Sequence, residues 1–77
     1  MNTMMIRLDN FEKLKSFVDD CSQFDEEMEV VSGRSIANAK SILGLMTLDL
    51  MHPLELRIIS SESKSDEIMK LLRIYQL

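Results

Sequence analysis

The chain has 77 residues, of which 45% are hydrophobic, enough for one small domain and too few for a second core. Thirteen acidic residues against nine basic ones give a net charge of −4, and the bases form no cluster, which argues against a general nucleic-acid binder. The apolar start is too short for a signal peptide, and no stretch reaches the ~20 apolar residues of a membrane span, so we expect one cytoplasmic domain over residues 1–77 with no membrane contact.

The first half of the chain predicts a strand, an amphipathic helix and a second strand. Residues 3–8 are a short apolar run that suits a strand. Asp9 and Asn10 can cap the helix that follows, and Glu12 stands three residues after Asp9, as in a capping box. The inner face of this helix is expected to carry Phe11, Leu14, Phe17, Val18 and Cys21. After an acidic turn, residues 27–31 alternate as a second strand does.

The second half predicts a hairpin, a short helix, a fourth strand and a last helix. Gly33 supplies the hairpin turn, because glycine takes positive φ without steric cost, and residues 34–38 return as the third strand. A helix is expected from about residue 40 to 48, and Pro53 closes the loop after it. Residues 54–59 alternate as the fourth strand.

The last helix is expected to begin after Ser63 or Ser65, either of which can act as its cap. Tyr75 is expected to pack against the sheet with its hydroxyl outward. The element order is then β-α-β-β-α-β-α. A sheet this small can be covered on one face only, so the order predicts an α+β fold of two layers.

The stretch GRSIANAKSILGLM at residues 33–46 resembles the second half of the histidine-containing phosphocarrier (HPr) proteins of the bacterial sugar phosphotransferase system. The element order is similar to that family's as well, so the resemblance covers nearly the whole chain. It implies the family's fold, an HPr-like open-faced sandwich in which three helices cover a four-stranded antiparallel sheet.

One departure from the family concerns the phosphoryl acceptor. Aligned without gaps back from Phe17, the family's acceptor histidine falls on Asn10, its arginine on Glu12 and the following proline on Lys13. A phosphohistidine relay needs an imidazole nitrogen as nucleophile and a guanidinium to neutralise the phosphoryl group. An amide cannot carry that group and a carboxylate repels it. We therefore expect no catalytic residue, no enzymatic activity and no phosphoryl-carrier activity.

The single histidine and the single cysteine are expected to have no special chemistry. His52 is predicted to lie in the loop before the fourth strand, at the surface, with Glu55 as its only possible carboxylate partner. One histidine is too few for zinc, and Cys21 is expected to pack as a small hydrophobe. No metal and no cofactor is predicted, and one cysteine excludes an internal disulfide.

Ser41 matches the serine that a dedicated kinase phosphorylates in the family's Gram-positive members, whose phosphorylated form binds a transcriptional regulator. A phosphate on Ser41 would lie at a helix N-terminus, where the dipole favours an anion by about 0.3–1 kcal/mol. The alternative interpretation is that Ser41 only caps this helix. The exposed patch for partner contact that the resemblance implies is Ile42, Leu43 and Met46.

The sequence therefore predicts a regulatory protein-binding module under the control of phosphorylation at Ser41. Its expected partners are proteins, namely a serine kinase, a transcriptional regulator or enzymes of the phosphotransferase system. Two alternatives stay open. One is a working phosphocarrier of the phosphoenolpyruvate-dependent system that uses another acceptor, such as His52. The other is a divergent interaction or assembly domain unrelated to sugar uptake.

Overall fold

A four-stranded antiparallel sheet forms one layer of the protein, in the computed structural model that describes residues 2–77. The strands lie in the order β1-β4-β2-β3. Their bounds are β1 (Asn2–Ile6), β2 (Glu27–Ser32), β3 (Ser35–Asn38) and β4 (Leu54–Ile59). The predicted hairpin is confirmed, because β2 pairs with β3 around Gly33, which has a φ of 58°.

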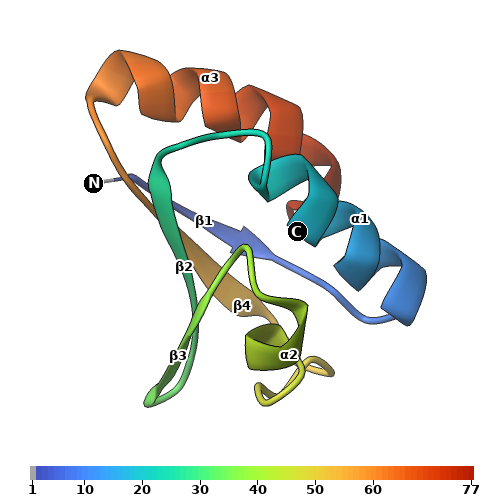
Figure 1. The fold of residues 1–77 in the computed structure, drawn as a ribbon. Helices are drawn as coiled ribbons and strands as arrows, with labels where there is room; N and C mark the ends of the chain where they lie inside the picture. The colour runs from blue at the N-terminus through green and yellow to red at the C-terminus, as the bar shows by residue number, and fades with distance from the viewer. Residues whose placement is uncertain (1) are drawn as a thin grey trace.

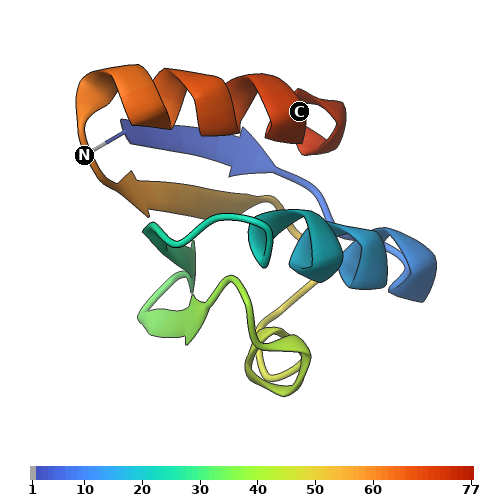
Figure 2. The ribbon, with the colours of Figure 1, turned by 45° about the horizontal axis from the view of Figure 1, so that its top comes forward.

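Three helices form the second layer, and the predicted HPr-like α+β sandwich is confirmed (Figures 1 and 2). They are α1 (Phe11–Cys21), α2 (Ile42–Leu45) and α3 (Glu62–Leu72), and a 3-10 turn, η1 (Arg73–Tyr75), follows α3. Within residues 2–77, no helix has both the length and the apolar character needed to cross a membrane.

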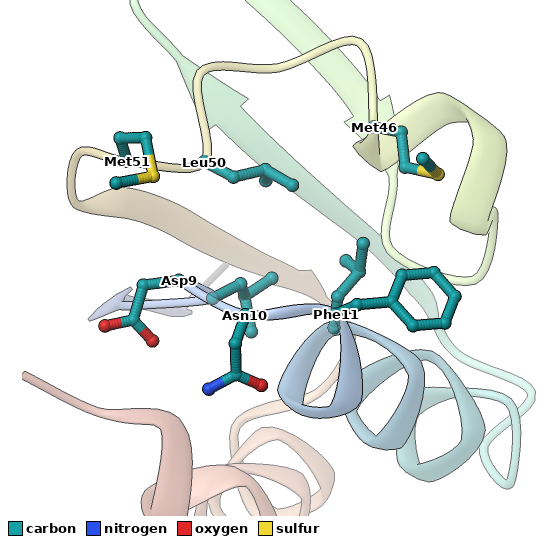
Figure 3. Close-up of a pocket in the computed structure, with 8 residues that line it drawn as sticks. Asp9, Asn10, Phe11, Met46, Leu50 and Met51 are labelled. Carbon is teal, nitrogen blue, oxygen red and sulfur yellow. The ribbon is translucent and has the colours of Figure 1, made fainter.

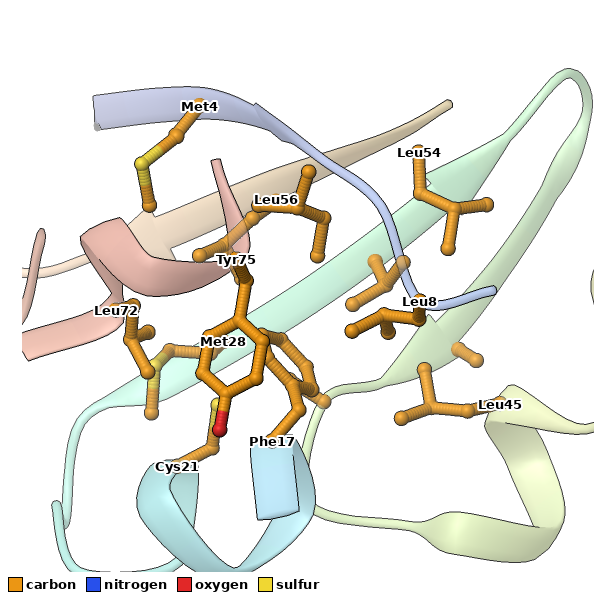
Figure 4. Close-up of a cluster of buried hydrophobic side chains, with 14 of the residues drawn as sticks. Met4, Leu8, Phe17, Cys21, Met28, Leu45, Leu54, Leu56, Leu72 and Tyr75 are labelled. Atoms are coloured by element: carbon orange, nitrogen blue, oxygen red, sulfur yellow. The ribbon is translucent and has the colours of Figure 1, made fainter. Parts of the chain in front are cut away.

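The core lies between the sheet and the helices (Figure 4). Every second residue of a strand is buried, as expected where helices cover one face of an antiparallel sheet and water the other. The strands contribute Met4, Ile6, Met28, Val30, Ala37, Leu54, Leu56 and Ile58, and the helices contribute Leu14, Phe17, Cys21, Leu45, Ile68 and Leu72. This layer holds α1 and α2 in fixed positions on the sheet.

The second helix is shorter than the sequence predicts. It covers only four residues, because the chain turns sharply on both sides of it. Before it, the Asn38 side chain accepts a hydrogen bond from the Lys40 amide at 2.8 Å. After it, the Thr47 and Leu48 amides bond to carbonyls three residues back, at 3.2 and 3.0 Å, instead of four.

The cap of α1 is one of the two expected residues, but it is not Asp9, so the expected capping box of Asp9 and Glu12 was wrong, and the cap of α3 also differs. Asn10 caps α1, since its Oδ1 accepts a hydrogen bond from the Lys13 amide at 2.7 Å. Ser61 caps α3, so the expected caps Ser63 and Ser65 were wrong. Ser65 is buried instead and its hydroxyl lies 2.8 Å from that of Ser60.

Tyr75 packs onto α1, and the expectation of an outward hydroxyl was wrong. The side chain is buried, and its ring meets the Phe17 ring edge to face at 5.2 Å. The hydroxyl donates to Asp20 Oδ2 at 2.6 Å and lies 2.8 Å from Ser16 Oγ. Burial, with the Asp20 bond next, raises the pKa of Tyr75 to about 12. The end of the chain is therefore fastened to α1.

Replacing Tyr75 by phenylalanine is expected to lower the free energy of unfolding by about 1–2 kcal/mol. The variant keeps the ring contact with Phe17 and loses a hydrogen bond to a carboxylate that is itself partly exposed. Urea unfolding followed by circular dichroism measures this difference. Ser16→Ala is the control, since it leaves the Tyr75–Asp20 bond in place, and an equal loss in both variants would contradict the assignment.

Candidate functional site

A groove of about 240 Å³ lies between the start of α1 and the segment that leads from α2 to β4 (Figure 3). Two rows of side chains face each other across it. The residues that line this α1–α2 groove are Leu8, Asp9, Asn10, Phe11 and Leu14 on one side and Met46, Leu50 and Met51 on the other. Six of the eight are apolar, so the groove offers hydrophobic contact more than polar recognition.

Several large apolar side chains at this groove remain open to solvent. Phe11 is 59% exposed, Met46 53% and Met51 73%, and Leu43 on the neighbouring α2 is 76% exposed. Scattered apolar residues are normal on a surface, whereas a group of them beside a groove is typical of a protein contact site. Phe11 was expected on the buried face of α1. It is exposed because it is the first residue of the helix, where the helix projects beyond the sheet.

Asn10 and Glu12, onto which the resemblance places the family's histidine and arginine, both lie at the start of α1. Asn10 lines the groove, but its amide points away from the Met46–Met51 side in Figure 3 and holds the Lys13 amide. Glu12 lies exposed in the first turn. Lys13 Nζ lies 3.3 Å from Asp9 Oδ1, and its hydrogen bond lowers the pKa of Asp9. The Lys13 ammonium in the first turns of α1 is thus paired with a carboxylate.

Ser41 caps α2. Its Oγ accepts a hydrogen bond from the Gly44 amide at 3.0 Å, so Ser41 is the N-cap, while the interpretation that it only caps the helix stays untested. A methyl group on residue 44 would lie 3.1 Å from that oxygen, which explains why glycine suits this position. Ser41 is half-buried, and phosphorylation of its hydroxyl stays a prediction.

The three residues expected to contact a partner lie on α2 and at its end, with unequal exposure. Leu43 and Met46 are exposed, and Met46 also lines the groove. Ile42 is half-buried and packs against the core, so less of it is available than the resemblance implies. Sequence reasoning missed Phe11 and Leu50 as groove residues. Both residues have large apolar side chains and lie in short segments next to the expected site. These two properties were the signal in the sequence that could have identified them.

His52 lies at the surface, as predicted, with a partner that differs from the predicted one. Its Nδ1 is 2.7 Å from Asp49 Oδ2, and its side chain is 75% exposed. Glu55, the expected partner, bonds instead to Arg57 Nε at 2.9 Å. Among residues 2–77, no three His, Cys, Asp or Glu side chains are placed to share a metal ion.

Cys21 is fully buried, and burial raises the pKa of its thiol to about 12. The thiol therefore stays protonated at any ordinary pH of the folded protein. We expect native Cys21 to react with iodoacetamide at pH 8 on the order of a hundredfold more slowly than the same thiol in urea-unfolded chain. Mass spectrometry of timed samples measures both rates, and equal rates would contradict a buried, protonated thiol.

The family model described as "PTS HPr component phosphorylation site" matches residues 14–75, a span that begins after Asn10 and Glu12 and includes Ser41. Among curated protein sequences, none matches the chain.

Solved structures of phosphocarrier proteins share the fold. HPr-C-His from Thermoanaerobacter tengcongensis has a TM-score of 0.75 and 24% identity, over 94% of this chain and 90% of that one. The phosphocarrier protein HPr from Bacillus anthracis str. Ames has a TM-score of 0.77 and 21% identity, over 99% and 94%. The histidine-containing phosphocarrier protein of Mycoplasma has a TM-score of 0.66 and 12% identity, over 99% and 98%.

Proposed function

Since the chain belongs to the HPr family of the phosphotransferase system, we propose that it is a member that has lost histidine phosphotransfer and acts by binding protein partners. The observation that carries this proposal is the start of α1. A carrier needs a nucleophilic ring nitrogen and a free cation there, and this chain offers the Asn10 amide and the Glu12 carboxylate.

The exposed apolar surface supports a binding role. Exposure of the Phe11, Met46 and Met51 side chains to water is unfavourable. A partner that covers these side chains would therefore lower the free energy of the complex. The thioether side chains are flexible, which suits contact with more than one partner. A protein that acts only by binding partners needs such an apolar surface and does not need a phosphoryl acceptor.

Ser41 is proposed as the regulated position, with a serine kinase acting on it and a transcriptional regulator as one partner. Ser41 is half-buried, and Leu43 and Met46, two and five residues further along the chain, are exposed. A phosphate on Oγ would add a charge of about −1.5 to −2 next to this apolar surface and would crowd the cap on Gly44. Phosphorylation would therefore change which partners the surface accepts.

One contact favours a second candidate function, that of a working phosphocarrier with His52 as the acceptor. Asp49 lies against Nδ1 of His52, which leaves Nε2 of an exposed imidazole free. In a working carrier, the Nε2 lone pair would attack the phosphorus of a phosphohistidine donor. The P–N bond of the donor would break, and its electron pair would return to the donor imidazole. No arginine or lysine contacts this pair among the interactions of residues 2–77, which makes this the weaker candidate.

A phosphotransfer assay separates the two candidates. The full chain is incubated with phosphoenolpyruvate and the first enzyme of the pathway, and acid-labile phosphate is measured. We expect none above the level of the His52→Ala variant. Label that disappears in His52→Ala would overturn the proposal in favour of the carrier.

A kinase assay tests the regulated position. With a serine kinase of this system and ATP, we expect acid-stable phosphate in the wild type and none in Ser41→Ala. Ser35→Ala is the matched control, because it removes another serine hydroxyl that caps no helix. If the wild type takes up no phosphate, the proposal that Ser41 is phosphorylated is wrong. Binding of partners by the unmodified chain would then remain as the proposed function.

A further inference from the structure

We infer that the outer edge of β3 binds the same edge of a second copy of this chain, so that two sheets join into one. The two β3 strands would run antiparallel, with Ile36 of each copy opposite Ile36 of the other. Three properties of β3 support this contact, namely an open edge, outward-facing backbone groups and side chains that complement those of a second copy. The contact is independent of the partner binding and of the Ser41 modification proposed above.

The two edges of the sheet differ in how they are covered. The edge strands are β1 and β3. The end of the chain covers β1, because the Leu77 amide donates to the Met5 carbonyl at 3.1 Å and the Arg7 amide to the Tyr75 carbonyl at 3.0 Å. Within residues 2–77, no strand pairs with the outer side of β3. The strand, Ser35–Asn38, also has no lysine or proline, residues that often prevent pairing at an open edge.

The register of the hairpin shows which backbone groups of β3 point outward. The Ala39 amide donates to the Met28 carbonyl at 3.0 Å, so these two residues form a hydrogen-bonded pair. Such pairs alternate along an antiparallel ladder, which makes Val31 and Ile36 a pair without mutual hydrogen bonds. The N–H and C=O of Ile36 therefore point away from β2. Each Ile36 could donate to the carbonyl of the other Ile36 and accept from its amide.

The side chains near this edge complement those of a second copy. Ile36 is 57% exposed on the face of the sheet that no helix covers, and the pairing would bring two such side chains together. The same register would place Arg34 of one copy opposite Asn38 of the other. Glu29 pairs directly with Asn38 in each copy. Because strands lie about 4.8 Å apart, Arg34 would reach the Glu29 carboxylate of the other copy, and symmetry would form this ion pair twice.

The other charges near this edge are engaged within their own copy or are screened. Arg57 stands opposite Glu29 in the sheet, but its Nε donates to Glu55 at 2.9 Å. Lys40, which follows β3, donates to a backbone carbonyl of its own copy. Glu27 and the net charge of −4 oppose association, and salt screens this repulsion beyond about 8–10 Å. The ion pair across the edge therefore decides the preferred register.

The dimer is expected to be weak, because β3 has only four residues. A contact this short would bury less than the roughly 1,200 Å² at the lower end of stable interfaces. We expect a reversible dimer with a Kd on the order of 0.1–1 mM. Sedimentation equilibrium of the full chain from about 0.02 to 2 mM measures this constant. A chain that stays monomeric over this range would overturn the inference.

Two substitutions of Ile36 test the strand pairing. Ile36→Lys would place like charges opposite each other, and Ile36→Pro removes the outward N–H without removing a ladder bond of the hairpin. We expect each variant to weaken dimerisation at least about tenfold and to keep native circular dichroism. Ile59→Lys is the matched control, since Ile59 is also exposed but lies on β4, two strands from this edge. Equal losses in Ile36→Lys and Ile59→Lys would overturn the inference.

A charge reversal tests the ion pair across the edge. We expect Arg34→Glu to weaken dimerisation about three- to tenfold at low salt, because it would bring a carboxylate toward Glu29 of the other copy. Lys15→Glu changes the net charge equally on the exposed side of α1, and we expect a less than about twofold effect. Equal effects of the two reversals would mean that net charge alone acts and would overturn the inference.

Amide chemical shifts recorded at rising concentration of the wild type locate the contact. We expect the amides of Ile36 and Asn38 to shift with concentration and those of β1 to stay unchanged. Shifts at β1 or at the α1–α2 groove, without shifts at β3, would assign a dimer to another surface and overturn the inference. Phosphate on His52 would overturn the proposed function and would leave this result unaffected.

Discussion

The Phe17→Ala variant is expected to lose about 3–5 kcal/mol of unfolding free energy, the largest stability effect of any change considered for this chain. Phe17 is fully buried between the sheet and α1, and its ring carries the edge-to-face contact with Tyr75. A domain of this length has about 4–12 kcal/mol in total. The variant therefore loses a large share of its stability, and urea unfolding at 25 °C measures the loss.

Phe11→Ala is the matched control, because it makes the same chemical change in the same helix. Phe11 is 59% exposed, so we expect a loss below about 1 kcal/mol and native circular dichroism. Similar losses for the two variants would contradict the assignment of Phe17 to the core and Phe11 to the groove surface.

The second large effect is a gain of phosphoryl-accepting activity at the start of α1. The double variant Asn10→His and Glu12→Arg is expected to accept acid-labile phosphate from phosphoenolpyruvate and the first enzyme of the pathway, where the wild type accepts none. The imidazole supplies the nucleophile, and the guanidinium replaces a repelling carboxylate. Phosphate bound per chain, measured after alkaline and acid treatment, gives the result.

Asn10→His alone is the control for the charge. With Glu12 still in place we expect much less phosphate, because the carboxylate opposes the incoming anion. Loss of the Asn10 cap costs about 0.5–2 kcal/mol, so circular dichroism must show that both variants fold. A folded double variant that takes no phosphate would mean that the missing acceptor is not what prevents carrier activity.

Much of the fold could be predicted from local pattern. Alternation defined β4 at residues 54–59 with its observed bounds, and Gly33 marked the hairpin. Asn10 was a good cap by residue type and is the cap in the structure. These features depend on neighbours within four residues, and the sequence shows those neighbours directly.

The ends of helices were harder. Ser61, Ser63 and Ser65 all have the residue type of a cap, and residue type alone does not distinguish Ser61, which the structure uses. The α2 helix has four residues because the Asn38 turn limits its start and the i→i+3 bonds of the Thr47 and Leu48 amides end it. Apolar spacing continues through residue 48, so the pattern alone predicted a longer helix.

The sequence by itself determined the order of the elements, the family resemblance and the chemical types at residues 10 and 12. Tertiary structure alone decided that Phe11 faces solvent while Phe17 lies in the core, since helical periodicity gives a face but not what lies opposite it. It also brought Tyr75 to Asp20, 55 residues away, and residues 46–51 to the start of α1. Contacts of such sequence separation depend on how the layers pack, and the spacing of residues along a chain does not encode that.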